Sequence, residues 1–100
     1  MKSPRRYQAS WNDTVLADSD DVVIVEGNVY FPNQSLSGEH LQPARGRSLC
    51  IWKGLASYYD VVVDGATNPG AAWYYPHPTP LARRIKDRVA FWQGVKVEVA

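Results

Sequence analysis

The chain has 100 residues, of which 45% are hydrophobic and 21% are charged; this is the size and composition of one globular domain and excludes a disordered chain. Eleven basic residues stand against ten acidic ones, so the net charge of +1 creates no overall field that would attract nucleic acid or an anionic membrane. We therefore expect a single domain over residues 1–100, with no nucleic-acid and no membrane partner.

A single cysteine, Cys50, excludes an internal disulfide and fits a reducing compartment. Residues 1–7 include three basic residues but no apolar stretch follows them, so this segment does not have the pattern of a secretory signal. No run approaches the ~20 apolar residues of a membrane span. We expect a cytoplasmic protein.

Short runs of β-branched and aromatic residues, separated by turn residues at intervals of about ten, predict an all-β domain of seven or eight strands. Nine runs fit this description, slightly more than the seven or eight strands we expect: residues 8–11, 14–19, 22–25, 28–31, 47–53, 56–63, 71–75, 89–92 and 95–99. Asn12-Asp13 and Glu26-Gly27 tolerate the positive φ angles of tight turns, so the first four runs predict two hairpins. Pro32 ends the second hairpin because it has no N–H to donate.

The middle of the chain is harder to assign. Residues 33–46 are polar and show no period of either kind, which predicts a long irregular loop. Residues 47–53 and 56–63 predict two central strands interrupted at Gly54. Residues 66–70, around Asn68-Pro69-Gly70, predict a turn.

The C-terminal quarter contains the one helix signal. Thr79 is suited to the N-cap and Pro80 to the first helical position, and Leu81 and Ile85 lie four residues apart on one face, which predicts a short helix near residues 80–86. The last two runs flank Gln93-Gly94 and predict a closing hairpin. In its second strand, Val95, Val97 and Val99 alternate with charged residues, the pattern of a half-buried strand.

Several familiar sites are excluded by spacing. Structural zinc uses four Cys or His ligands, whereas this chain has only Cys50, His40 and His77, all well separated, so we expect no metal. No glycine-rich phosphate loop with a following lysine is present. No serine has the flanking glycines of a hydrolase nucleophile elbow. We expect no cofactor.

Six short motifs carry a resemblance to a known family. In chain order they are Glu26-Gly27-Asn28, Tyr30-Phe31-Pro32, Cys50-Ile51-Trp52-Lys53-Gly54, Tyr58-Tyr59, Ala72-Trp73-Tyr74 and Ala90-Phe91-Trp92. With these motifs the chain resembles the bacterial family called domain of unknown function 427, and the match spans nearly its whole length. Ile51 stands where the family usually has proline, which frees a backbone N–H at that bend.

The resemblance implies a fold but no activity. It implies the β-tent architecture, a mainly β fold in which two antiparallel sheets meet at a steep angle. Many β-tent proteins hold zinc through paired cysteines, which this chain lacks, so that metal is not carried over. Because a fold alone does not determine function, the residues have to be weighed on their own chemistry.

The aromatic residues suggest a binding cleft between the sheets. Trp and Tyr supply large apolar faces with polar tips, and concave aromatic sites with a few polar groups bind small molecules. The expected ligand-binding residues are Glu26, Tyr30, Trp52, Lys53, Tyr58, Trp73 and Tyr75. For Trp11 and Trp92, each beside a hairpin turn, we expect core or sheet-edge packing instead.

Alternatives remain open at single residues. A solvated surface position is the default for Lys53, and the functional alternative is that it binds an anionic group or a carbonyl, or pairs with Glu26. Cys50 is the catalytic candidate of a second hypothesis, an enzyme with a redox or covalent nucleophile, although burial as a small hydrophobe is the simpler interpretation. A third hypothesis is a protein-interaction module that pairs through a free sheet edge.

Overall fold

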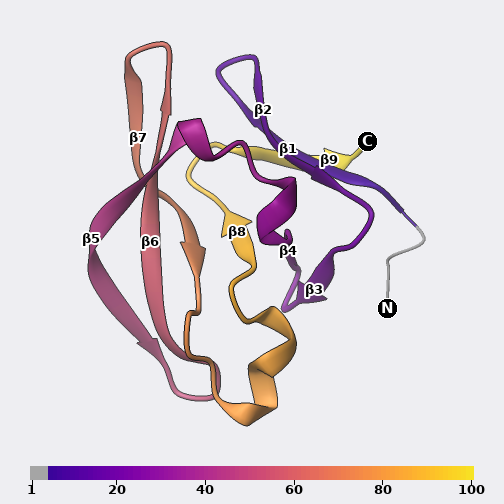
Figure 1. Cartoon of the computed structure of the whole chain (residues 1–100), viewed down its shortest axis with the longest axis vertical. Helices are drawn as coiled ribbons and strands as arrows, with labels where there is room; N and C mark the ends of the chain where they lie inside the picture. The colour runs from indigo at the N-terminus through magenta and orange to yellow at the C-terminus, as the bar shows by residue number, and fades with distance from the viewer. Residues whose placement is uncertain (1–4) are drawn as a thin grey trace.

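The computed structural model of the chain describes residues 5–100; residues 1–4, the first part of the segment in which we find no secretory signal, lie outside the described residues. The described part has nine strands in three antiparallel sheets, together with three short 3-10 helices (Figure 1). The expectation of a mainly β fold is confirmed. The strands form three sheets where two were expected, and there are nine of them rather than seven or eight.

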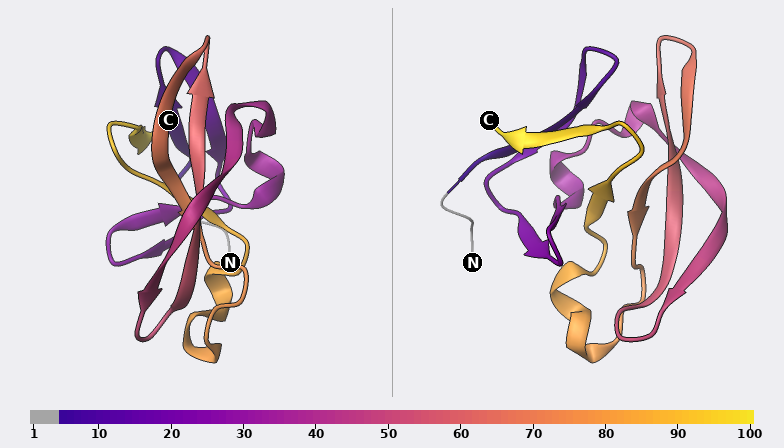
Figure 2. Two further views of the ribbon diagram at one scale, coloured as in Figure 1. Left: turned by 90° about the vertical axis from the view of Figure 1, so that its left-hand side faces the viewer. Right: turned by 180° about the vertical axis from the view of Figure 1, so that it is seen from behind.

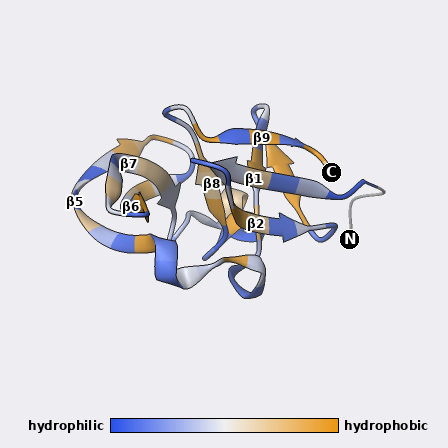
Figure 3. Cartoon of the chain, turned by 90° about the horizontal axis from the view of Figure 1, so that it is seen from above, coloured by the Kyte–Doolittle hydropathy of each residue, from blue (hydrophilic) through white to orange (hydrophobic). Residues whose placement is uncertain are grey.

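The largest sheet has four strands in the order β5-β6-β7-β8. Their bounds are β5 Leu41–Cys50, β6 Gly54–Val63, β7 Ala66–Tyr74 and β8 Val89–Phe91. The second sheet has the order β2-β1-β9, with β1 Tyr7–Trp11, β2 Thr14–Ser19 and β9 Lys96–Val99. Hydrophobic and hydrophilic residues alternate along β9, as the sequence pattern predicts (Figure 3).

The third sheet is the hairpin of β3 (Val23–Val25) and β4 (Asn28–Tyr30). Both predicted N-terminal hairpins are confirmed, and their turns have the expected positive φ angles: 52° and 59° at Asn12 and Asp13, and 54° and 80° at Glu26 and Gly27. Viewed along an edge of the large sheet, the β3–β4 hairpin extends to one side and the segment with η1 (Asn33–Ser35) and η2 (Gly38–His40) to the other (Figure 2).

One residue ties the β3–β4 hairpin to the large sheet. Phe31 follows β4 directly and exchanges two backbone hydrogen bonds with Val89 of β8, with N–O distances of 2.8 and 2.9 Å. Because both residues are almost completely buried, this bridge holds the hairpin against the large sheet from within the core.

The predicted closing hairpin is wrong. Gln93 and Gly94 do form a turn, with φ angles of 56° and 88°, but the strands on either side diverge. β8 pairs with β7, whereas β9 pairs with β1, so the last two strands belong to different sheets. The turn chemistry was identified correctly, but it does not determine which strands pair.

Two predicted connections are also wrong. The polar segment 33–46 is not an irregular loop throughout, because it contains η1 and η2 and the first part of β5, which is kinked by a register shift between Pro43 and Arg47. Residues 66–70 belong to β7 and do not form a separate turn. The Asp60 carboxylate accepts the Gly70 N–H at 2.8 Å where the β6–β7 register shifts, so a bulge accommodates the Pro-Gly pair within the strand.

The predicted helix is a 3-10 helix, η3 (Pro80–Ile85). Its two apolar residues do not share a face: Ile85 is 0% exposed and Leu81 is 81% exposed. The Thr79 side chain does not cap the helix; its hydroxyl donates to the backbone carbonyl of Trp52 instead. A bend at Ala82, whose φ and ψ are not helical, turns Leu81 away from the core.

Two clusters of buried residues form the core. One lies between the three-stranded sheet and the large sheet and is centred on Leu16, Phe31 and Val61. The other lies beneath the β3–β4 hairpin and η3 and contains Tyr30, Tyr75 and Ile85. Among residues 5–100, no helix is long and apolar enough to cross a membrane. The candidate functional site lies at the second cluster.

Candidate functional site

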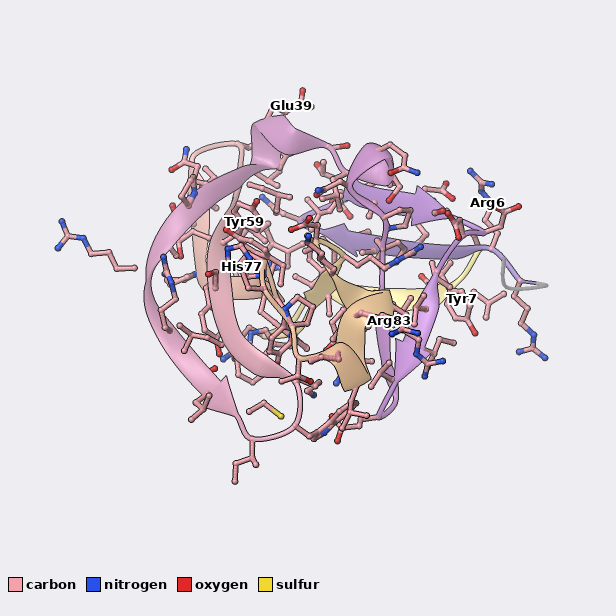
Figure 4. All side chains as sticks on the ribbon, turned by 60° about the horizontal axis from the view of Figure 1, so that its bottom comes forward. Arg6, Tyr7, Glu39, Tyr59, His77 and Arg83 are labelled. Carbon is pink, nitrogen blue, oxygen red and sulfur yellow. The ribbon has the colours of Figure 1, made fainter. Side chains whose placement is uncertain are left out.

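The site begins at the connection between β5 and β6. The predicted strand 47–53 ends at Cys50, and residues 51–53 form a turn, so Trp52 and Lys53 do not lie in a strand. This turn is held by the segment that joins β7 to η3, because Thr79 N–H donates to the Lys53 carbonyl at 3.0 Å. Figure 4 shows this end of the molecule, with His77 and Arg83 on the segment between β7 and β8.

Lys53 is buried, not solvated. Only 7% of the residue is exposed, and its ammonium forms an ion pair with the Glu26 carboxylate at the β3–β4 turn. The indole N–H of Trp52 donates to the other oxygen of the same carboxylate at 3.3 Å. The β3–β4 hairpin therefore supplies the counter-charge for the β5–β6 turn, and the solvated default for Lys53 is wrong.

Both members of the ion pair are charged at neutral pH. The hydrogen bonds from Lys53 and Trp52 hold the pKa of the Glu26 carboxyl below its usual 4.5. Burial lowers the pKa of the Lys53 ammonium, but the Glu26 hydrogen bond and the interactions with Tyr30 and Tyr75 outweigh it, so the pKa lies above its usual 10.5. The pair therefore persists across the physiological range.

The Lys53 ammonium also contacts aromatic rings. Its nitrogen lies 5.4 Å from the centre of the Trp52 ring and 5.7 Å from that of Tyr75. Both distances are within the range of a cation–π interaction. The Lys53 ammonium therefore already lies against the Trp52 and Tyr75 rings.

A cavity of about 150 Å³ opens beside this ammonium. It is lined by Lys53, Tyr58, Trp73, Tyr75 and Trp92. Tyr58 and Trp73 are direct register partners on β6 and β7, so their side chains project from the same face of the large sheet. The Trp73 and Trp92 rings meet edge to face, with centroids 5.4 Å apart. Neighbouring strands therefore build the aromatic wall.

Hydrogen bonds orient the aromatic side chains. Trp73 donates its indole N–H to the Tyr30 hydroxyl at 3.2 Å, and Trp92 donates to the Gly70 carbonyl at 2.7 Å. The Tyr58 hydroxyl shares a 2.6 Å hydrogen bond with Ser48. The cavity walls are therefore held in defined orientations.

The buried tyrosines keep their protons at neutral pH. Burial raises the pKa of Tyr30, and the Trp73 hydrogen bond opposes this only in part. Burial likewise raises the pKa of Tyr75 despite the nearby Lys53 ammonium. Tyr75, which lines the cavity, is therefore neutral.

Of the seven residues expected to bind a ligand, four line the cavity: Lys53, Tyr58, Trp73 and Tyr75. The other three contact lining residues: Glu26 and Trp52 contact Lys53, and Tyr30 contacts Trp73. The sequence reasoning missed Trp92, which was expected to pack in the core or at a sheet edge but lines the cavity and is 46% exposed. Trp11 does pack against the first core cluster. The one sequence feature that singled out Trp92 was its place in the Ala90-Phe91-Trp92 motif.

Cys50 lies at the end of β5, half-buried against the second core cluster. Its role as a nucleophile stays a prediction, tested by the rate at which the folded protein reacts with a thiol reagent. Within residues 5–100, no group of three or more His, Cys, Asp and Glu side chains is arranged to hold a metal ion.

Two larger hollows contain no aromatic side chain. One, of about 570 Å³, lies along Pro80, Leu81, Arg83 and Arg84. The other, of about 250 Å³, lies between residues 32–34 and 86–88. In the part of the chain that the structure describes, the site at Lys53 therefore differs from both in its chemistry.

The fold and this site define a small, mainly β domain with an aromatic cavity next to a buried lysine. The family model described as domain of unknown function (DUF427) matches residues 1–100, so the chain belongs to that family, and the resemblance noted in its motifs is confirmed. A search of curated proteins returned no match.

Proposed function

We propose that this chain is a small-molecule binding domain whose ligand occupies the cavity beside Lys53. One observation carries the proposal: four aromatic side chains and one buried ammonium, brought together from β6, β7 and two turns, line a single cavity of about 150 Å³. Mostly aromatic walls with a few fixed polar groups are typical of ligand sites. The single cysteine supports a cytoplasmic place of action.

The four indole N–H groups provide a direct test by NMR. Trp73 and Trp92 belong to the cavity wall, whereas Trp11 packs in a different core cluster. In a screen of ring-sized fragments, we expect binders to shift the indole signals of Trp73 and Trp92 and to leave that of Trp11 unchanged. Shifts spread equally over all tryptophans, or no shift with any fragment, would overturn the proposal.

A wall variant sharpens this test. Trp92 is 46% exposed, so Trp92→Ala removes one wall of the cavity with little effect on the core, and we expect fragment affinity to fall by about tenfold. Leu81→Ala removes a side chain that is more exposed still and does not line this cavity, and it should leave the affinity unchanged.

A second candidate function is pairing through the outer edge of β5. Within the described residues β5 pairs only with β6, and its last four residues, Arg47 to Cys50, follow the register shift as a regular strand with Leu49 75% exposed. Such an edge accepts an added strand. Light scattering tests this candidate: self-association that Leu49→Pro abolishes would support it, and a strict monomer that binds no extended peptide would contradict it.

A further inference from the structure

The Lys53 ammonium has more N–H donors than the described residues give it hydrogen-bond acceptors. An ammonium carries three N–H donors, and Glu26 is the one hydrogen-bond acceptor that the described residues give to it. Its side chain is 8% exposed and lines the cavity, whereas the Glu26 side chain is 53% exposed and faces solvent. A ligand in the cavity therefore meets the ammonium from the side that the carboxylate leaves free.

The same geometry disfavours a cationic ligand. Aromatic cages bind ammonium ions by offering ring faces to the charge. Here Lys53 already lies over the ring of Tyr75, which lines the cavity, so a second cation in the cavity would meet a like charge. Tyr75, which also lines the cavity, is neutral and offers no negative charge to a second cation.

The volume of the cavity accommodates about one ring. A cavity of about 150 Å³ holds a molecule the size of benzene. The indole and phenol rings of Trp73, Trp92 and Tyr58 offer flat faces against which a planar ring packs. The cavity volume and the aromatic walls therefore both favour a flat, single-ring group as the part of the ligand that occupies the cavity.

From these observations, and resting on the proposed function, we propose that the ligand is a flat, single-ring molecule that carries an acceptor oxygen, and that this oxygen accepts a hydrogen bond from Lys53 Nζ while the ring packs against Trp73 and Trp92. Two classes of ligand provide such an acceptor oxygen: a molecule with a neutral carbonyl and a molecule with a carboxylate.

Three probes of similar size separate the possibilities: benzamide, benzoate and benzylamine. Titrated one at a time into the protein and followed by the indole NMR signals, benzamide or benzoate should bind about tenfold or more tightly than benzylamine, the lower end of the effect of a hydrogen bond to a charged group. The stronger of the two oxygen probes identifies the source, because a carboxylate is attracted by Lys53 but repelled by Glu26, whereas an amide is not. Affinities of about millimolar are expected for probes with so few atoms.

Lys53→Met supplies the matched variant. Methionine keeps most of the apolar stem, and Glu26, once freed, faces solvent, so no unpaired charge is left buried. In this variant the preference for the oxygen probes should fall to less than about threefold. Lys96→Met, on β9 with a side chain that is 69% exposed, should keep the full preference.

The possible failures are distinguishable. If benzylamine binds as tightly as the oxygen probes, or if Lys53→Met keeps the preference, the acceptor-oxygen inference is overturned while the binding function stands. If no probe and no fragment shifts the Trp73 and Trp92 signals, both are overturned. The comparison among probes uses the unaltered chain, so it does not depend on whether a variant folds.

Discussion

Replacement of Gly54 by alanine tests how the site is held. Gly54 is the first residue of β6 and has φ of +116°, outside the region that side-chain-bearing residues adopt. An added Cβ would lie 3.3 Å from the His77 carbonyl oxygen and 3.5 Å from Pro78 Cα. Both neighbours are backbone atoms, so they can move only by shifting the segment that hydrogen-bonds to the Lys53 carbonyl through Thr79.

The size of the effect follows from two contributions. A residue held in such a sparsely populated backbone region costs about 1–3 kcal/mol. Weakening the Thr79–Lys53 hydrogen bond adds about 0.5–1.5 kcal/mol. We therefore expect Gly54→Ala to lower the free energy of unfolding by about 2–4 kcal/mol and the melting temperature by about 10–20 °C.

Gly65→Ala is the matched control. Gly65 lies in the β6–β7 turn with φ of +78°, and an added Cβ there has no atom within 4 Å, so only the backbone term applies. Gly65→Ala should cost about 1–2 kcal/mol, the cost of a left-handed conformation for a residue with a Cβ. Both variants are measured by urea denaturation, followed by circular dichroism. If Gly54→Ala destabilises the protein no more than Gly65→Ala does, the close approach of the 77–79 segment does not hold the turn.

Three further predictions concern the same region. Tyr30→Phe removes the acceptor of the Trp73 indole and should cost about 1–2 kcal/mol in urea denaturation; an unchanged midpoint would show that this hydrogen bond does not contribute. Ile85→Ala should cost about 2–4 kcal/mol and Leu81→Ala less than about 0.5 kcal/mol, and equal losses would contradict their observed difference in burial. Because folding lowers the pKa of the Glu26 carboxyl, its ionised form stabilises the protein above pH 4.5, and this stabilisation is lost as the pH falls through the folded-state pKa. We therefore expect the melting temperature to decline less between about pH 7 and pH 3 in Glu26→Gln than in the unaltered chain. Parallel declines in the two proteins would refute this.

Local chemistry was sufficient to predict three two-residue turns but not the course of residues 66–70, which lie in β7. Asn12-Asp13 and Glu26-Gly27 both adopt the positive φ angles that their residue types tolerate, and the hairpins around them form as expected. Gln93-Gly94 also turns, yet no hairpin follows. The reason is that β1 provides a partner for β9 from the opposite end of the chain, and pairing over that distance leaves no local signal.

The aromatic part of the site was predictable for a related reason. Tyr58 and Trp73 both lie in predicted strands and are direct register partners there, although a bulge separates this pair from the β6–β7 turn. Lys53 lies just beyond the end of a strand, where alternation no longer applies, and its burial depends on a carboxylate 27 residues earlier in the chain. A charge is buried only when it is paired, and nothing in the spacing of these two residues shows that the pair forms.

The Lys53–Glu26 pair therefore links the stability of the domain to its proposed chemistry. An aliphatic side chain at position 53 would pack beneath the β3–β4 hairpin without any desolvation penalty, and replacing a buried ion pair by apolar residues is often neutral or stabilising. The ammonium instead belongs to a residue that lines the cavity, and Glu26, its one hydrogen-bond acceptor among the described residues, lies toward solvent. Packing alone does not require this arrangement, whereas the proposed ligand with an acceptor oxygen would use it.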